Sequence, residues 1–212
     1  MKKIQALLIS IAMAAFFLTG NAFAAPDPSK TTNNSSDSLS QRYIAEFMDG
    51  NFMMHFIFHA NIDGKPTSGD ITIASLDGRS MHKMAYENQI VRFIINNGSD
   101  YIVNDNEKMA INIKLLGIDP SAFAAPEYKG ADIIGSGTGT VMGKTLPYEE
   151  IAQPEEGSLR YYFEGTTLAY ITGQDMEQDF VMEILELTKD VPADLFNIPS
   201  NYRVVNSYQD ML

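Results

Sequence analysis

The segment NFMMHFIFHAN, Asn51 to Asn61, contains the clearest structural pattern in the sequence. Its large apolar side chains recur at every second position, which is the spacing of a β-strand buried on one face. One face carries Phe52, Met54, Phe56, Phe58 and Ala60, and the other carries Asn51, Met53, His55, Ile57 and His59. We therefore predict a strand here, and we expect its phenylalanine face to line an apolar interior.

Two-residue turn signals follow this strand at short intervals. Asp77-Gly78 and Asn97-Gly98 are flanked by alternating apolar segments, which favours tight hairpins. The pattern predicts six strands in the first half of the chain. The first is the strand that begins at Asn51, and the other five lie at 70–76, 79–86, 89–96, 101–104 and 109–113. Phe93 lies on an apolar face of the strand at 89–96. The second half predicts five more, at about 133–142, 145–152, 159–164, 168–172 and 180–187. About eleven short strands without a long helix predict a mainly β protein, an antiparallel curved sheet or half-barrel.

The first 24 residues have the composition of a secretory signal peptide. Lys2 and Lys3 precede an apolar run, and Ala22-Phe23-Ala24 supplies a small-residue cleavage site. The run is shorter than the roughly 20 residues that span a bilayer, so we expect cleavage and no stable membrane anchor. The protein is then periplasmic or secreted. Residues 25–40 are polar and predict a flexible tether, and residues 41–212 predict a single β domain that opens with a short helix at 40–48.

The chain is acidic and has no cysteine. Its net charge is −12, which becomes −14 without Lys2 and Lys3. Nucleic acids and anionic lipid headgroups bind positive charge, so a chain this acidic is a poor candidate for either, and we predict no nucleic-acid partner. The lack of cysteine excludes disulfides, thiolate catalysis and cysteine metal sites.

The histidines do not predict a metal site either. On a strand His55 and His59 lie about 13 Å apart, too far to share one zinc ion. We expect these two and His82 at the surface. No nucleophile motif is present. We predict no metal, no cofactor and no enzymatic activity.

The segment from Gly135 to Thr145, GSGTGTVMGKT, superficially resembles a phosphate-binding loop. The first glycine of that pattern would fall on Thr138, and Pro154 leaves too little room for the helix that such a loop must start. We therefore exclude a nucleotide as ligand. The segment instead predicts a strand followed by a hairpin turn at Gly143-Lys144.

Three glycines leave one face of this strand bare. They are Gly135, Gly137 and Gly139, which alternate with serine and threonine. A bare face either permits strong coiling and packing against a helix, or leaves room for a ligand. In the second case we expect Gly137 to lie opposite Phe56 and Phe93.

The order of the segments resembles the LolA/LolB-like fold of outer-membrane lipoprotein carrier proteins. The resembling stretches run from Phe47 to Val205; they include GDITIASLDGRSMHKMAY, IVRFIINNGSDYIVNDNEKMAINI and the closing EILELTKDVPADLFNIPSNYRVV. The resemblance implies an eleven-stranded half-barrel with short helices as a lid over an apolar cavity. It also implies a lid at 120–125 with Phe123 as its apolar contact, and an inward arginine, for which Arg92 is the candidate.

These features predict a non-enzymatic binding protein for lipid or lipoprotein acyl chains. The candidate ligand-binding residues are Phe52, Met54, Phe56, Phe58, Phe93, Phe123 and Gly137. The alternative is a protein-interaction or envelope-sensing domain whose core is filled by its own side chains. The ten methionines outside the leader suit either an ordinary core or an adaptable cavity.

Overall fold

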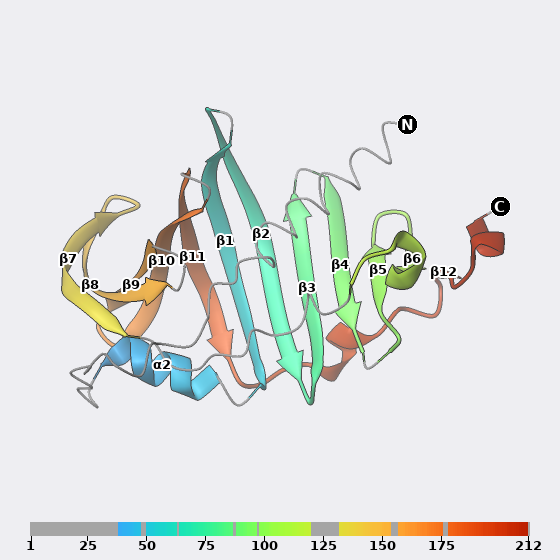
Figure 1. The fold of residues 1–212 in the computed structure, drawn as a ribbon, viewed down its shortest axis with the longest axis horizontal. Helices are drawn as coiled ribbons and strands as arrows, with labels where there is room; N and C mark the ends of the chain where they lie inside the picture. The colour runs from blue at the N-terminus through green and yellow to red at the C-terminus, as the bar shows by residue number, and fades with distance from the viewer. Residues whose placement is uncertain are drawn as a thin grey trace.

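The computed structural model describes residues 38–47, 50–62, 64–86, 88–96, 98–119, 132–153, 157–175 and 178–211. Twelve strands of this part form one curved sheet, in the order β12-β6-β5-β4-β3-β2-β1-β11-β10-β9-β8-β7 (Figure 1). The first half of the chain supplies α2 (Leu39–Phe47), β1 (Phe52–Ile62), β2 (Lys65–Leu76), β3 (Arg79–Tyr86), β4 (Gln89–Ile95), β5 (Tyr101–Asn104), β6 (Met109–Asn112) and η1 (Ile113–Leu116). The second half supplies β7 (Ile133–Val141), β8 (Lys144–Gln153), β9 (Gly157–Glu164), β10 (Thr167–Asp175), β11 (Gln178–Thr188), η3 (Ala193–Phe196), β12 (Arg203–Val205) and η4 (Tyr208–Met211).

The predicted mainly β, antiparallel curved sheet is confirmed, with one strand more than expected. The eleven expected strands are all present, and each consecutive pair within β1–β6 and β7–β11 is antiparallel. β1 lies in the middle, where it pairs with β2 on one side and with β11 on the other. The additional strand, β12, pairs parallel with β6.

Tight turns join the strands as the sequence indicates. Asp77 and Gly78 have φ values of 51° and 76°, and Met142 and Gly143 have 47° and 78°. Positive φ at both central residues is the geometry of the type I′ turn, whose twist matches that of the flanking strands. The supposed phosphate loop is thus the β7–β8 hairpin.

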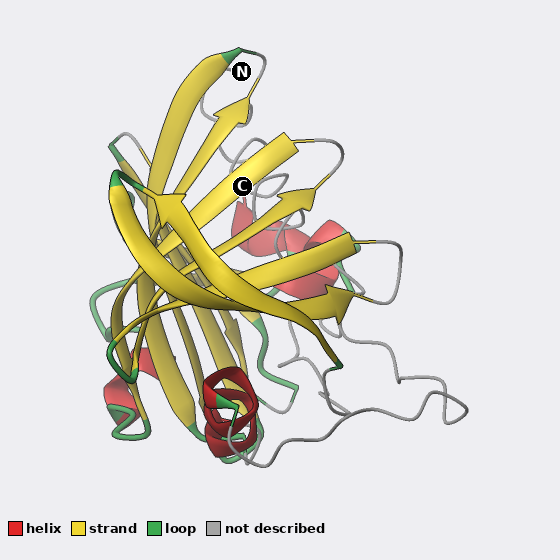
Figure 2. Ribbon diagram, turned by 90° about the vertical axis from the view of Figure 1, so that its left-hand side faces the viewer, coloured by secondary structure: helices red, strands yellow, loops and turns green. Residues whose placement is uncertain are grey.

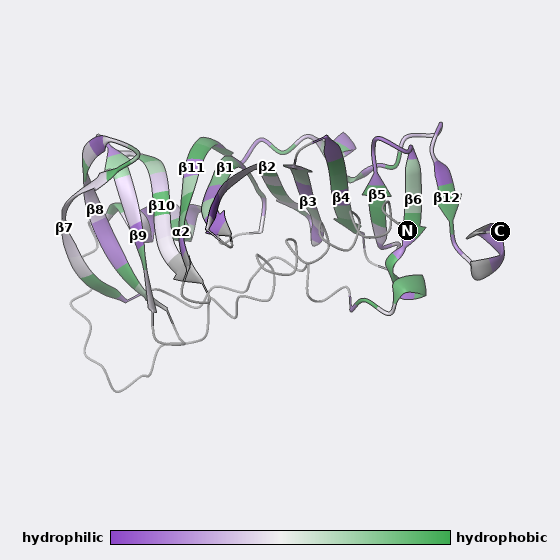
Figure 3. Ribbon diagram, turned by 90° about the horizontal axis from the view of Figure 1, so that it is seen from above, coloured by the Kyte–Doolittle hydropathy of each residue, from purple (hydrophilic) through white to green (hydrophobic). Residues whose placement is uncertain are grey.

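Three irregularities account for the stronger bend at one end of the sheet. The register shifts between His55 and Phe56 against β11, between Leu168 and Tyr170 against β9, and between Ile133 and Gly135 against β8. A bulge bends its strand and increases the local twist. All three affect β7–β11, where the strands curl away from the plane of β2–β4 (Figures 1 and 3). Seen from the β7 end of the sheet, the strands nearest to β7 cross the more distant strands at a steep angle (Figure 2).

Side chains pack on both faces of the sheet, which we call the inner and outer faces. The inner face contacts α2, and the outer face contacts η3. The outer face carries a cluster beneath the C-terminal segment, made of Ala74, Met81, Ile94, Val103, Ala110 and Phe196. A second outer cluster lies on β7–β11 and contains Val141, Tyr162 and Tyr170.

Candidate functional site

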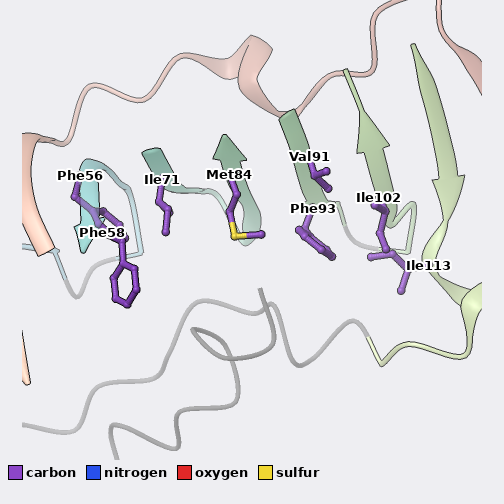
Figure 4. Close-up of a cluster of buried hydrophobic side chains, with 8 residues drawn as sticks. All are labelled: Phe56, Phe58, Ile71, Met84, Val91, Phe93, Ile102 and Ile113. Atoms are coloured by element: carbon purple, nitrogen blue, oxygen red, sulfur yellow. The ribbon is translucent and has the colours of Figure 1, made fainter. Parts of the chain in front are cut away.

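The inner face is lined by large apolar side chains that the strand register places in rows. Phe56 lies opposite Ile71, which lies opposite Met84, and Met84 in turn lies opposite Val91. Eight buried residues from five strands and η1 form this inner cluster (Figure 4): Phe56, Phe58, Ile71, Met84, Val91, Phe93, Ile102 and Ile113. Phe56 and Phe93 are both 0% exposed, so the centre of the face is fully covered.

The structure brings together four of the predicted site residues. Phe56, Phe58 and Phe93 belong to the inner cluster, and Met54 packs against it. Phe52 begins β1, pairs with Ser75 on β2 and is only half-buried. Phe123 and the expected lid at 120–125 lie outside the described residues.

His82 is buried, and the expectation that it lies at the surface is wrong. It is 6% exposed and pairs with Ile73 on β2 and Phe93 on β4. Those partners belong to the inner face, so the imidazole is part of the apolar interior. His55 and His59 are half-buried. The Nε2 atom of His55 lies 3.0 Å from the Asp70 carboxylate, and the Nε2 atom of His59 lies 3.5 Å from the Glu183 carboxylate. Among the described residues no group of three metal-binding side chains occurs.

The helix α2 covers the other half of the inner face. Its Leu39, Tyr43 and Ile44 pack against a second inner cluster, made of Ile151, Tyr161, Phe163, Leu168 and Ile171. The rings of Tyr43 and Phe163 lie 5.9 Å apart, and the Tyr43 hydroxyl accepts a 3.1 Å hydrogen bond from the Leu168 N–H. Burial raises the pKa of Tyr161 to about 12, as expected in an apolar surrounding.

Glu149 on β8 holds the beginning of α2. Its carboxylate accepts hydrogen bonds from the hydroxyls of Ser38 and Ser40 and from the N–H groups of Leu39 (3.1 Å) and Ser40 (2.8 Å). A carboxylate at this end also matches the positive end of the helix dipole. Burial alone would raise the pKa of Glu149, but the hydrogen bonds from Ser40, Ser38 and Leu39 outweigh it and hold the pKa below its ordinary 4.5.

Sequence reasoning missed this anchor and placed the start of the helix slightly late. Ser38 caps the helix by accepting a bond from the Gln41 N–H, and Ser38 and Ser40 are 4% and 0% exposed. The last residues of the expected tether therefore belong to the folded domain, while residues 25–37 lie outside the described part. The Ser-x-x-Gln spacing of Ser38 and Gln41 is a capping-box signal that marks the correct start.

Gly137 does not lie opposite Phe56 and Phe93, so its expected position is wrong. It is on β7, the edge strand, and pairs with Tyr148, which pairs with Tyr162. These tyrosines belong to the outer face. A Cβ on Gly137 would lie 3.2–3.3 Å from the Tyr148 ring, so the bare face gives room to aromatic rings of the neighbouring strands.

Arg92 does not point inward either. It lies on the outer face, where its guanidinium donates to both carboxylate oxygens of Asp105 at 2.8–3.1 Å and to the Asn197 carbonyl at 3.2 Å. The Tyr202 hydroxyl donates to the same carboxylate, and burial together with this bond raises the pKa of Tyr202. Arg92 and Asp105 therefore tie the segment after β11 to the sheet.

Two of the cavities among the described residues lie on opposite faces of the sheet and differ in size. On the inner face a space of about 20 Å³ lies beside Phe58, Gly69, Ile71 and Tyr86. On the outer face a groove of about 400 Å³ lies between β4, β5 and the η3 segment, lined by Ile94, Tyr101, Phe196 and Ile198 among others.

Membrane-spanning helices do not occur in the part of the chain that the structure describes. No protein-family model matches the chain, and no curated protein matches its sequence.

Solved structures with a similar fold were found. One is an uncharacterized conserved protein from Thermus thermophilus, with 9% identity and a TM-score of 0.43, over 79% of this chain and 99% of that chain. LprF from Mycobacterium bovis has 11% identity and a TM-score of 0.42, over 84% and 100%. A LolA superfamily protein from Nitrosomonas europaea has 9% identity and a TM-score of 0.37, over 79% and 98%. A LolA superfamily protein is thus among the structures that this chain resembles, as the sequence indicated.

Proposed function

We propose that the chain is a non-enzymatic binding protein for the acyl chains of lipids or lipidated proteins, which occupy the inner face of the sheet. One observation carries this proposal. The two inner clusters share Met182 and Ile184, so the apolar lining continues without interruption from β5 to β8. At a strand spacing of about 4.8 Å these nine neighbouring strands span roughly 40 Å. An acyl chain needs such a surface, because it has no polar group to orient it.

The buried centre of the inner face, with Phe56 and Phe93 at 0% exposure, requires a cover that opens. Ligand pockets have about 300–1,000 Å³, whereas the space beside Phe58 and Ile71 has about 20 Å³. An acyl chain therefore enters only when part of the covering structure moves. Among the described elements α2 is suited to this movement, because a helix of nine residues is marginal in water without tertiary contacts.

The anchors of α2 set what opening costs. The Glu149 bonds hold the beginning of the helix, and Tyr43 holds its middle against Phe163 and Leu168. Displacing α2 would uncover the second inner cluster, which an acyl chain would then cover again. Because the ligand would make the apolar contacts that α2 gives up, replacing the helix by the ligand changes the exposed apolar area of the sheet little.

The export signal in the sequence agrees with this proposal. A periplasmic or secreted location after cleavage places the protein where acyl chains must cross an aqueous space. The acidic surface supports a carrier that does not adhere to anionic membranes.

A second function is favoured by a different observation. Phe56 and Phe93 have no exposed surface, so the inner face as it stands is filled. A filled core suits a protein-interaction or envelope-sensing domain that uses its outer surfaces. The two functions differ in whether the inner face takes up an apolar ligand.

Uptake of dansyl-labelled palmitic acid separates them. We expect saturable binding by the wild type, and faster uptake by Tyr43→Ala, which loses the ring contact with Phe163 and the bond to Leu168. Arg42→Ala is the matched control, since Arg42 is an exposed residue of the same helix. Native mass spectrometry of gently purified protein reports any ligand already bound. Absence of dye binding by both the wild type and Tyr43→Ala would establish a self-filled core and refute the carrier.

A further inference from the structure

The two edges of the sheet differ in a way that acyl-chain binding does not explain. β12 has three residues, one of them the charged Arg203, whose guanidinium donates to the Asp210 carbonyl of η4. β7 has nine residues, IIGSGTGTV, without a charge or a proline. Proteins normally protect sheet edges with short strands, charges, prolines or covering segments. β12 is protected in this way, whereas β7 has none of the first three devices.

Within the part of the chain that the structure describes, β7 is not covered either. Ser136, Gly137, Thr138 and Thr140 are exposed. The two large apolar side chains at the ends of the edge are exposed as well, Ile134 at 59% and Met142 at 52%. An edge of this length that stays uncovered is a template for another strand.

The register identifies which backbone groups face outward. Val141 and Lys144 close a two-residue hairpin, and such a closing pair is hydrogen-bonded. Hydrogen-bonded and non-bonded pairs alternate along an antiparallel ladder, so Thr138 forms a non-bonded pair with its partner on β8. That partner is Pro147, which has no N–H to donate. Ser136, Thr138 and Thr140 therefore direct their N–H and C=O groups away from the sheet.

The side chains around this edge specify what fits it. On the outer face the rings of Tyr148 and Tyr162 lie over Gly137 and Gly139, at 3.1–3.3 Å from where a Cβ would stand. A neighbouring strand with large side chains on that face would contact these rings, as aromatic residues do beside edge glycines. Serine and threonine on the inner side accept polar neighbours.

We propose that β7 binds an extended segment of a partner protein, which adds a thirteenth strand to the sheet. The segment has large apolar or aromatic residues at alternate positions and basic flanks that complement the net charge of −12. A second copy of this chain fits less well. Two β7 strands would oppose glycine to glycine with little side-chain packing, and would bring two acidic domains together.

The test uses a synthetic peptide in which phenylalanine and threonine alternate between lysine flanks. Binding is followed by fluorescence anisotropy of the labelled peptide, and hydrogen exchange reports the amides of Ser136, Thr138 and Thr140. We expect saturable binding and slower exchange at those three amides. A peptide of the same sequence with alternate N-methylated amides, which cannot extend the ladder, should not bind.

Thr138→Pro removes one outward N–H without removing a bond to β8, and Thr138→Lys adds the charge that edges usually carry. We expect both variants to keep the wild-type melting temperature within a few degrees and to bind the peptide at least about tenfold more weakly. Thr145→Lys is the matched control, because Thr145 is exposed on β8, which is not an edge. Equal binding by wild type and both Thr138 variants, or no binding by the wild type, would overturn the proposal. A concentration-dependent dimer that Thr138→Pro abolishes would overturn the choice of partner in favour of a second copy.

Discussion

Replacing Glu149 with alanine should release α2 while the sheet stays folded. The carboxylate accepts two bonds from backbone N–H groups and two from hydroxyls. The hydroxyls of Ser38 and Ser40 lie 3.1 Å apart and can bond each other, so the main loss is at the N–H groups of Leu39 and Ser40.

The magnitude follows from those two groups. A helix cap contributes about 1 kcal/mol, and a hydrogen bond to a charged group contributes about 1.5–3 kcal/mol. Because water replaces part of the loss once the helix end opens, we expect α2 opening to become easier by about 3 kcal/mol. That corresponds to a rise of roughly a hundredfold in the population of the open form.

Residue-resolved hydrogen exchange measures the opening of α2 directly, because the α2 amides lose protection when the helix opens. Glu150→Ala is the matched control, because the neighbouring carboxylate binds Ser158 and Arg160 instead of the helix. We expect the α2 amides to lose protection only in Glu149→Ala, and that variant to take up the acyl probe faster. Unchanged α2 protection, or an equal loss in the Glu150 control, would refute the assignment of Glu149 as the anchor.

The remaining predictions concern the pH dependence of α2 protection and the contacts that hold the segment after β11 to the sheet. The folded-state pKa of Glu149 is lowered, so its stabilisation is present above about pH 4.5 and is lost as pH falls through the lowered pKa. α2 protection factors should therefore fall in acid for the wild type and stay flat for Glu149→Gln; a flat wild-type profile would contradict this. Arg92→Lys keeps the charge but loses the two-pronged contact with Asp105, whose side chain is 20% exposed. We expect a loss of about 1–3 kcal/mol, or roughly 2–10 °C in melting temperature, with exposed Arg42→Lys as the control; an unchanged melting temperature would show that the segment is held by its apolar contacts alone.

Alternation and turn chemistry predicted the strands because both act locally. The face of Phe56 and Phe93 follows from a period of two, and the hairpins follow from residues such as Gly78 and Gly143 that permit positive φ. The same alternation contained the correct position of Arg92. With Phe93 inward, its neighbour Arg92 must lie on the other face, so the resemblance suggested a position that the strand pattern excludes.

Other features depend on contacts between distant segments and have no local pattern. Gly137 could belong to either face until the order of the strands is known. β12 pairs in parallel with β6 and has only three residues, which are too few to show an alternation of apolar and polar side chains. Glu149 and Tyr43 act across more than 100 residues of chain. The burial of His82, in contrast, follows from the Asp77-Gly78 turn, which places it opposite Ile73.

The central position of β1 has a consequence for folding. Met53 pairs with Ala74 on one side and with Thr188 on the other. The first of these neighbours lies nearby in the sequence, whereas the second lies near the end of the chain. β1 therefore keeps one unpaired side until β11 is present, and closing so long a loop makes this pairing late and slow. A chaperone that binds extended apolar segments would meet its target here, and truncated chains that end before β11 should aggregate.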